Sequence, residues 1–222
     1  MQAAMDNSLP KLTNIEQVCG GWVKKYVLTY EMPDGRLHYY DSVSRKDIDA
    51  YRAELEANAA GKTAPATADA VCIVPITVDK RLVMIKEFRY PLNSYCIAFP
   101  AGLMEPGEDM VHSAERELLE ETGYALHRDE DGEPVVRVLS QAGYSSAGMS
   151  SETVQVIYAY VENEPAQEQK TEENELIQVF TLPVGQIETF LRENTVPIGT
   201  RAQLILESFA NAKSYLSALN AE

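Results

Sequence analysis

The chain has 222 residues, 45% hydrophobic and 24% charged, which is typical of a globular protein with one well-cored domain and an appendage. Thirty-four acidic residues against nineteen basic ones give a formal net charge of -15, which disfavours a nucleic acid partner. Neither a signal-peptide pattern nor an apolar run of membrane-spanning length is present, so we expect a cytoplasmic protein with no membrane partner.

The N-terminal part of the chain predicts a β-rich arm. Two β-rich runs flank the Pro-Asp-Gly sequence at 33–35, and Asp-Gly between such runs is typical of a tight turn, so residues 20–43 predict a β-hairpin. Residues 46–60 have helix-forming composition, and a small-residue linker with a proline follows them. We therefore divide the chain into an arm with a helical linker, 1–66, and a larger domain, 67–222.

The larger domain alternates strands with a few helices, which predicts a mixed α/β fold. The predicted strands span 70–78, 81–90, 135–143, 153–161 and 176–182. The predicted helices span 108–122, 183–193 and 198–219, and an acidic loop at 162–175 precedes the last strand. In the first of these helices Met110, Ala114 and Leu118, with Val111 beside them, recur at helical spacing and predict its buried face.

The same helix carries a dense acidic face. Glu117, Glu120 and Glu121 stand at i, i+3 and i+4, so their carboxylates face one volume. Like charges at this spacing repel, and a hard divalent cation such as Mg²⁺ prefers oxygen ligands. Arg116 can reach Glu120 across one turn and orient it. For such a helix taken alone, a solvated charged face is the alternative interpretation.

The spacing around this helix is specific. The stretch fits G-x5-E-x7-R-E-U-x-E-E-x-G-U, where U is a bulky apolar residue. The seven fixed positions are Gly102, Glu108, Arg116, Glu117, Glu120, Glu121 and Gly123, and Leu118 and Tyr124 fill the two U positions. Seven fixed residues would match by chance roughly once in 10⁸ starting points. The stretch resembles the signature of the Nudix hydrolases.

This resemblance implies an α/β/α sandwich around a mixed sheet, with an N-terminal antiparallel β-arm, and Mg²⁺-dependent hydrolysis of a nucleoside diphosphate linked to another group. Mn²⁺ is the other possible metal. By position, Glu117 and Glu121 match the family's main metal ligands, Glu120 stands beside them, and the carbonyl of Ala101 is a further candidate ligand. Glu120 and Arg116 are also counted as catalytic residues.

The resemblance leaves the catalytic base open, because relatives draw it either from this signature or from an acidic loop late in the fold. Here "TEENELIQV" matches that loop. We choose Glu175, just before the strand, with Glu173 second. A solvated acidic loop is the alternative interpretation.

The flanks resemble the ADP-ribose pyrophosphatases within this family, through "EFRYPLNSYCIAFPAGLMEPGED", "GGWVKKYVLTY" and "YYDSVSR". In dimeric members of that subfamily, an N-terminal β-domain is exchanged between subunits, aromatic residues grip the adenine and arginines grip the phosphates. The resemblance therefore implies a homodimer. The substrate-binding candidates are Trp22, Tyr40, Arg45, Arg89 and Leu103. The alternatives are a core aromatic for Trp22 and a surface charge for Arg89.

One position departs from the subfamily pattern. The stretch "SSAGMSSE" stands where Ser-Pro-Gly is frequent, and Ala147 replaces the expected proline. The selection of ADP-ribose over another ADP-sugar or a dinucleotide is therefore open. GDP-mannose and NADH are rival substrates that would use the same metal helix. A non-catalytic ADP-ribose sensor is a further alternative, although such sensors typically have a degraded signature, and this one is intact.

Overall fold

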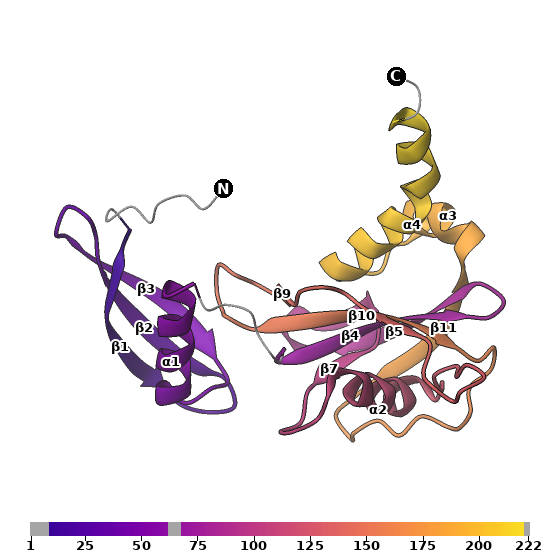
Figure 1. The fold of residues 1–222 in the computed structure, drawn as a ribbon, viewed down its shortest axis with the longest axis horizontal. Coiled ribbons are helices and arrows are strands. Elements are labelled where there is room, and N and C mark those ends of the chain that lie inside the picture. Colours follow the sequence, from indigo (N-terminus) through magenta and orange to yellow (C-terminus); the bar gives the residue numbers. More distant parts are fainter. Residues whose placement is uncertain (1–8, 62–67, 220–222) are drawn as a thin grey trace. The chain divides into compact units, whose positions relative to one another are not determined.

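The computed structural model describes residues 9–61 and 68–219, with side chains described up to residue 211 (Figure 1). The predicted boundary at residue 66 lies outside these residues. The described chain forms two compact units. The first contains the residues before the boundary together with Gly143–Thr153, a segment that the sequence analysis had assigned to the larger domain. The second contains the rest of the chain.

The first unit is an antiparallel sheet covered on one face by a helix. Its strands, in the order β1-β2-β3, are Lys11–Cys19, Lys24–Glu31 and Leu37–Ser44, and its helix α1 is Ile48–Ala59. Strands β2 and β3 confirm the predicted hairpin, and Gly35 takes a positive φ of 80° at its turn. The side chains of Ile15, Tyr26, Leu28 and Tyr51 form the core of this unit.

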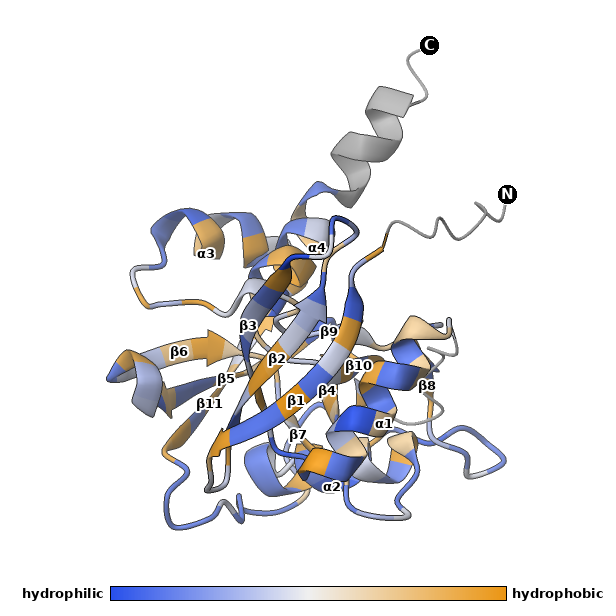
Figure 2. Cartoon of the chain, turned by 90° about the vertical axis from the view of Figure 1, so that its left-hand side faces the viewer, coloured by the Kyte–Doolittle hydropathy of each residue, from blue (hydrophilic) through white to orange (hydrophobic). Residues whose placement is uncertain are grey.

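Strand β1 was not predicted. It lies at the edge of the sheet (Figure 2). Within it only Ile15 is buried and only Leu12 is half-buried. A strand that buries so few side chains has no sustained alternation of apolar and polar residues. Its pairing with β2 defines it instead.

The second unit is built on a mixed sheet with the order β11-β5-β4-β10-β8, with β6 beside β5 and β7 beside β4. Strands β4 and β10 are parallel, and the other pairs along this order are antiparallel. The strands β4, β5, β6, β7, β8, β10 and β11 are Ala70–Thr77, Arg81–Arg89, Ser94–Ala98, Ala101–Leu103, Val136–Val138, Thr153–Val161 and Ile177–Pro183. The two-residue strand β9, Gly143–Tyr144, belongs to the segment that is part of the first unit.

Helices cover both faces of this sheet (Figure 1). Helix α2, Met110–Thr122, lies on one face, and α3, Ile187–Glu193, and α4, Thr200–Leu219, lie on the other. Strand β4 alternates between the layers: Val71 and Ile73 pack in the core with α2, whereas Cys72 and Val74 pack in the core with α4. The predicted α/β/α sandwich is confirmed. No helix among the described residues combines the length and the apolar character needed to span a membrane.

Three strands of the second unit differ from the sequence prediction. Strands β6 and β7, which flank the Phe99-Pro100 pair, were not predicted, and β8 covers only three residues of the strand expected over 135–143. Each is five residues or shorter, so its hydrophobic period is too brief to detect. Long-range pairing with β5, β4 and β10 makes these segments strands.

Candidate active site

Helix α2 positions the acidic residues of the candidate site. It begins after Asp109, whose carboxylate accepts hydrogen bonds from the amides of Val111 and His112 at 2.9 and 3.0 Å. Its buried face is the predicted one, with Ala114 and Leu118 fully buried against the sheet. The predicted glutamates lie beside this buried face, and Glu117 and Glu121 face the loop at residues 101–102, before the helix.

Arg116 is the cation at the centre of this cluster. Its guanidinium donates to both oxygens of Glu108 at 3.0 Å, to Glu117 at 2.7 Å and to the carbonyl of Leu103 at 3.1 Å. The predicted contact with Glu120 is present at 3.3 Å, but Glu108 is the main partner. These bonds lower the pKa of the Glu108 carboxyl to about 2. Glu108 is therefore ionised at neutral pH and keeps its ion pair with the arginine.

Glu117 and Glu121 are carboxylates held away from water. Glu121 is 5% exposed, and its Oε2 accepts a hydrogen bond from the amide of Ala101 at 3.0 Å. Burial raises the pKa of the Glu121 carboxyl well above its usual value. Burial also raises the pKa of Glu117, and its hydrogen bond with Arg116 opposes that rise. Because burial makes the ionised form of both carboxylates unfavourable in free energy, a bound cation would stabilise them.

Gly102 makes room for one of these carboxylates. A Cβ atom at this position would lie 1.9 to 2.2 Å from the carboxyl atoms of Glu117, far inside contact distance. Only glycine lets the loop and the carboxylate approach so closely. This close approach explains why the signature begins with a glycine.

The donor set fits a divalent metal. Its candidate ligands are all oxygens, the type that Mg²⁺ and Mn²⁺ prefer, and two are carboxylates with raised pKa values. The residues that would hold the ion are Glu117 and Glu121, with Glu120 and the Ala101 carbonyl beside them. Across the described ranges, no three His, Cys, Asp or Glu side chains already converge as a finished set of ligands. Because Arg116 holds Glu117 and Glu120, the carboxylates are ion-paired in this arrangement.

The acidic loop after β10 is fastened to the end of α2. The amide of Ala166 donates to the Gly123 carbonyl at 2.8 Å, and the amide of Lys170 donates to the Glu120 carbonyl at 2.9 Å. Gly123 has φ +76°, and a Cβ there would lie 2.2 Å from the carbonyl oxygen of Gln167. The glycine that ends the helix thus also receives the loop.

This loop brings Glu175 toward the carboxylate cluster. Besides burial, which is the larger cause, repulsion from Glu175 raises the pKa values of Glu117 and Glu121. Glu175 is half-buried and its carboxylate accepts the amide of Glu172 at 3.0 Å, whereas Glu173 is exposed. Of the two predicted bases, Glu175 is therefore the one whose charge reaches the site.

Glu87 is a residue of this region that the sequence analysis missed. Its side chain is 13% exposed, and its Oε2 lies 2.6 Å from Nη2 of Arg89, one of the predicted phosphate-binding residues. Burial raises the pKa of the Glu87 carboxyl. The available signal was the alternation of β5, which places Glu87 on the same side as buried Val83 and Ile85.

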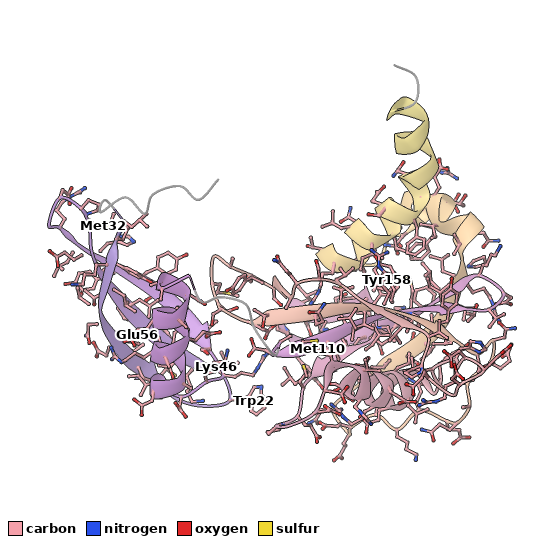
Figure 3. The ribbon with its side chains drawn as sticks, viewed as in Figure 1. Trp22, Met32, Lys46, Glu56, Met110 and Tyr158 are labelled. Atoms are coloured by element: carbon pink, nitrogen blue, oxygen red, sulfur yellow. The ribbon has the colours of Figure 1, made fainter. Side chains whose placement is uncertain are left out.

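The remaining predicted substrate-binding residues belong to the first unit, except Leu103. Trp22 is 74% exposed and stands clear of the three-stranded sheet, so it is not a core aromatic (Figure 3). The Tyr40 ring is 42% exposed, and its hydroxyl donates to the carbonyl of Gly148 at 2.6 Å. Arg45 is ion-paired with Glu152. Two of these three side chains, Tyr40 and Arg45, therefore contact the segment 143–153.

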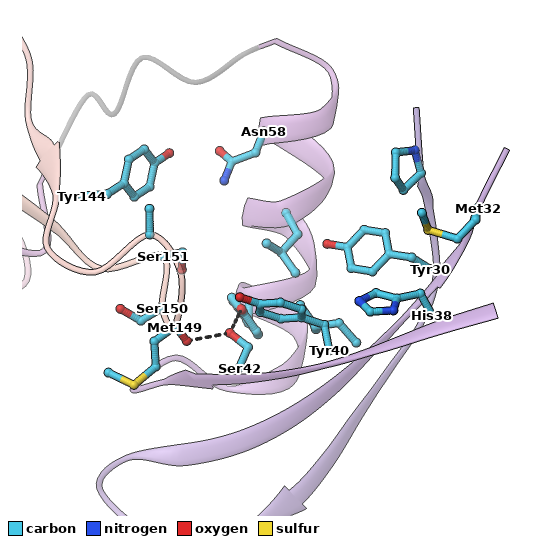
Figure 4. Close-up of a pocket in the computed structure, with 15 residues that line it drawn as sticks. Tyr30, Met32, His38, Tyr40, Ser42, Asn58, Tyr144, Met149, Ser150 and Ser151 are labelled. Atoms are coloured by element: carbon cyan, nitrogen blue, oxygen red, sulfur yellow. Dashed lines mark hydrogen bonds between the residues drawn. The ribbon is translucent and has the colours of Figure 1, made fainter. Parts of the chain in front are cut away.

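Tyr40 also lines a cavity of about 470 Å³ within the first unit (Figure 4). Tyr30, His38 and Tyr40 come from the sheet, Asn58 from α1 and Tyr144 from the segment 143–153. The bond from the Ser42 hydroxyl to the Met149 carbonyl, at 3.1 Å, joins the sheet to that segment. None of the described residues that line the cavity is lysine or arginine, so its aromatic walls suit an uncharged flat group better than a phosphate.

The second unit therefore combines a sheet between two helical layers with a carboxylate-bearing helix that lies against a glycine loop. The NUDIX domain family matches residues 66–200. The chain belongs to this family and is a Nudix hydrolase.

Several characterised proteins are similar to the chain. The ADP-sugar pyrophosphatase of Mus musculus is 32% identical over 183 residues, which cover 78% of this chain and 72% of that protein. The ADP-ribose pyrophosphatase of Saccharomyces cerevisiae is 26% identical over 205 residues, covering 87% and 79%. The crystal structure of an ADP compounds hydrolase superposes with a TM-score of 0.65 at 20% identity, covering 95% of each chain, and supports the fold.

Proposed function

We propose that this protein hydrolyses the diphosphate of ADP-ribose or a related ADP-sugar, giving AMP and a sugar phosphate, with Mg²⁺ as its cofactor and Mn²⁺ as a possible substitute. The observation that carries the proposal is a pair of carboxylates, the buried Glu121 and the half-buried Glu117, held against the loop at residues 101–102. The names of the similar mouse and yeast proteins support an ADP-linked substrate.

In this proposal the residues of α2 prepare the reaction site. When bound by Glu117, Glu121, Glu120 and the Ala101 carbonyl, a divalent metal supplies neutralisation of the diphosphate and acidifies water. Arg116, anchored by Glu108, holds the carboxylates of Glu117 and Glu120 in place. The exclusion of water around Glu121 strengthens every charge interaction there.

Glu175 is the proposed general base. It takes a proton from the attacking water, whose oxygen forms a bond to one phosphorus as the bridging P–O bond breaks. The bridging oxygen leaves with the other phosphate, so ADP-ribose yields AMP and ribose 5-phosphate. The half-buried position of Glu175 and its influence on Glu117 and Glu121 support this role.

The first unit is proposed to bind the adenine. Trp22 and Tyr40 offer exposed rings on which the base can stack, and Arg45 and Arg89 are the proposed phosphate-binding residues, with Leu103 beside the reaction site. Exposed aromatic side chains are a liability on a free surface, which supports a homodimer in which the partner's surface covers them. In that dimer, Trp22 of one chain and Tyr40 of the other would enclose the adenine.

The test is a substrate panel with the purified full-length protein. ADP-ribose, another ADP-sugar, GDP-mannose and NADH are incubated with Mg²⁺, with Mn²⁺ or with a chelator, and the products are separated and identified. We expect AMP and ribose 5-phosphate from ADP-ribose, and no turnover in the chelator. Preferential cleavage of GDP-mannose or NADH would reassign the substrate. Binding of ADP-ribose with no turnover in either metal would favour the sensor.

A further inference from the structure

Glu87, a half-buried acid, has no role in the chemistry described above, although it lies at the edge of the site. Strand β5 pairs with β11 so that Glu87 lies opposite Ile177, and the amide of Phe88 donates to the Leu176 carbonyl at 3.1 Å. Directly after β5, the hydroxyl of Tyr90 donates to the Asn174 carbonyl at 3.2 Å. The end of β5 therefore borders the loop that carries the proposed base.

Glu87 is an unusual residue at this place. Its Oε2 is sealed from solvent, and among the described residues no donor meets hydrogen-bond geometry with it, although Arg89 Nη2 is only 2.6 Å away. A buried polar atom without a hydrogen bond costs free energy, so a compensating use is expected. The cation paired with this carboxylate is Arg89, two residues further along the same strand.

Arg89 is held on one side and open on the other. The Arg89 side chain is 46% exposed and that of its partner Glu87 is 13% exposed. The carboxylate therefore lies on the inner side of the ion pair, and the guanidinium lies on the solvent side. A guanidinium has five N–H donors in a rigid plane, and the ion pair with Glu87 is made through Nη2. The other donors remain available for a planar pair of anionic oxygens, the geometry that arginine recognises in phosphates.

We propose that Glu87 is a positioning residue for substrate binding: it fixes the guanidinium of Arg89 at the border of the carboxylate site, where the free N–H groups bind a phosphate of the substrate. This inference rests on the proposed function, because it assumes a diphosphate substrate. Fixing the arginine before binding reduces the conformational entropy that binding would otherwise cost. The effect belongs to ground-state binding, so it changes affinity and KM more than kcat.

A double-mutant cycle tests the assignment. The dissociation constant for ADP-ribose is measured by calorimetry in a chelator, without divalent metal, so that no substrate is consumed. We expect Glu87→Gln to weaken binding by roughly 3–30-fold, the usual range for coupled charged neighbours. In the Arg89→Gln background the same change should have no further effect, because the residue that Glu87 positions is gone.

Glu115→Gln is the matched control. Glu115 pairs with Arg128 at 2.7 Å, and that arginine has the same 46% exposure as Arg89, but the proposed chemistry uses neither residue. This control should bind ADP-ribose like the wild type. With Mg²⁺, we expect Glu87→Gln to raise KM by the same factor as the dissociation constant, with kcat within about twofold of wild type.

The outcomes separate the two proposals. If the wild type hydrolyses ADP-ribose and Glu87→Gln binds it as tightly as the wild type or more tightly, the role of Glu87 is overturned and the proposed function stands. Equal losses in the wild-type and Arg89→Gln backgrounds overturn it too. If Glu87→Gln does not fold, Glu87→Asp, which keeps the charge on a shorter side chain, gives the same comparison. A wild type that cleaves nothing in the panel overturns the proposed function.

Discussion

Replacing Gly102 by alanine should remove activity while sparing the fold. The added Cβ would lie 1.9 Å from the carboxyl carbon of Glu117, whereas ordinary contact begins near 3.4 Å. The atoms in the way are the far end of a flexible side chain, so Glu117 can swing aside and the backbone can stay. The cost should therefore fall on the site and leave the stability of the protein nearly unchanged.

The size of the effect follows from the required displacement. The Glu117 carboxyl carbon must move by about 1.5 Å, and a misplacement of about 1 Å at a reaction site can cost 10²-fold in rate. Its 2.7 Å bond to Arg116 would also be lost. We expect kcat for ADP-ribose at saturating Mg²⁺ to fall by roughly 10²-fold or more, with the melting temperature within a few degrees of wild type.

The assay compares steady-state kinetics and thermal melts of four variants. Gly185→Ala is the control, because a Cβ at Gly185 has no atom within 4 Å and this glycine needs no positive φ. In a Glu117→Gln background, Gly102→Ala should add little, since the carboxylate it displaces is already gone. A Gly102→Ala variant with near-wild-type kcat would refute the argument that Glu117 must lie against this loop.

Three further predictions concern Glu121, Glu175 and Trp22. Glu121→Gln should lower kcat at least 10²-fold. In a chelator at neutral pH the same change should raise the melting temperature, because the raised folded-state pKa of the wild-type carboxyl means that ionising it above its unfolded pKa costs stability. An unchanged kcat, or a lower melting temperature, would contradict this. Glu175→Gln should lower kcat by roughly 10²–10⁴ without changing metal affinity in a calorimetric titration, while Glu173→Gln stays active; the reverse pattern would move the base to Glu173. Trp22→Ala should raise KM for ADP-ribose by roughly 5–150-fold with kcat almost unchanged, and an unchanged KM would remove Trp22 from the adenine site.

The acidic helix could be predicted from sequence because its information is local. The i, i+3 and i+4 spacing of Glu117, Glu120 and Glu121 fixes their shared face, and Ala114 and Leu118 fix the face that packs on the sheet. The two faces together orient the helix before any neighbour is known. The sandwich fold was inferred from the family resemblance, and the alternation of β4 between two cores supplies its physical basis.

Features that depend on long-range contacts could not be predicted from local sequence patterns. Strands β6 and β7 are defined by pairing with β5 and β4, and the segment Gly143–Thr153 is tied to the first unit through the bonds that Ser42 and Tyr40 make to its carbonyls. Glu87 was missed for another reason. A charged residue near the end of an apolar strand is usually solvated, and only the packing around it shows that this one is not.

The attachment of the acidic loop to the C-terminal turn of α2 has a consequence for insertions and deletions. Because the loop is fastened at Gly123 and Glu120, the path from Ala166 to Glu175 sets how far the base reaches. The longer stretch between the helix and that attachment, including β8, does not set this distance. Length changes there that spare the strands and the segment Gly143–Thr153 should be tolerated by the chemistry. One residue gained or lost between Lys170 and Glu175 should instead put the carboxylate out of register with its partners.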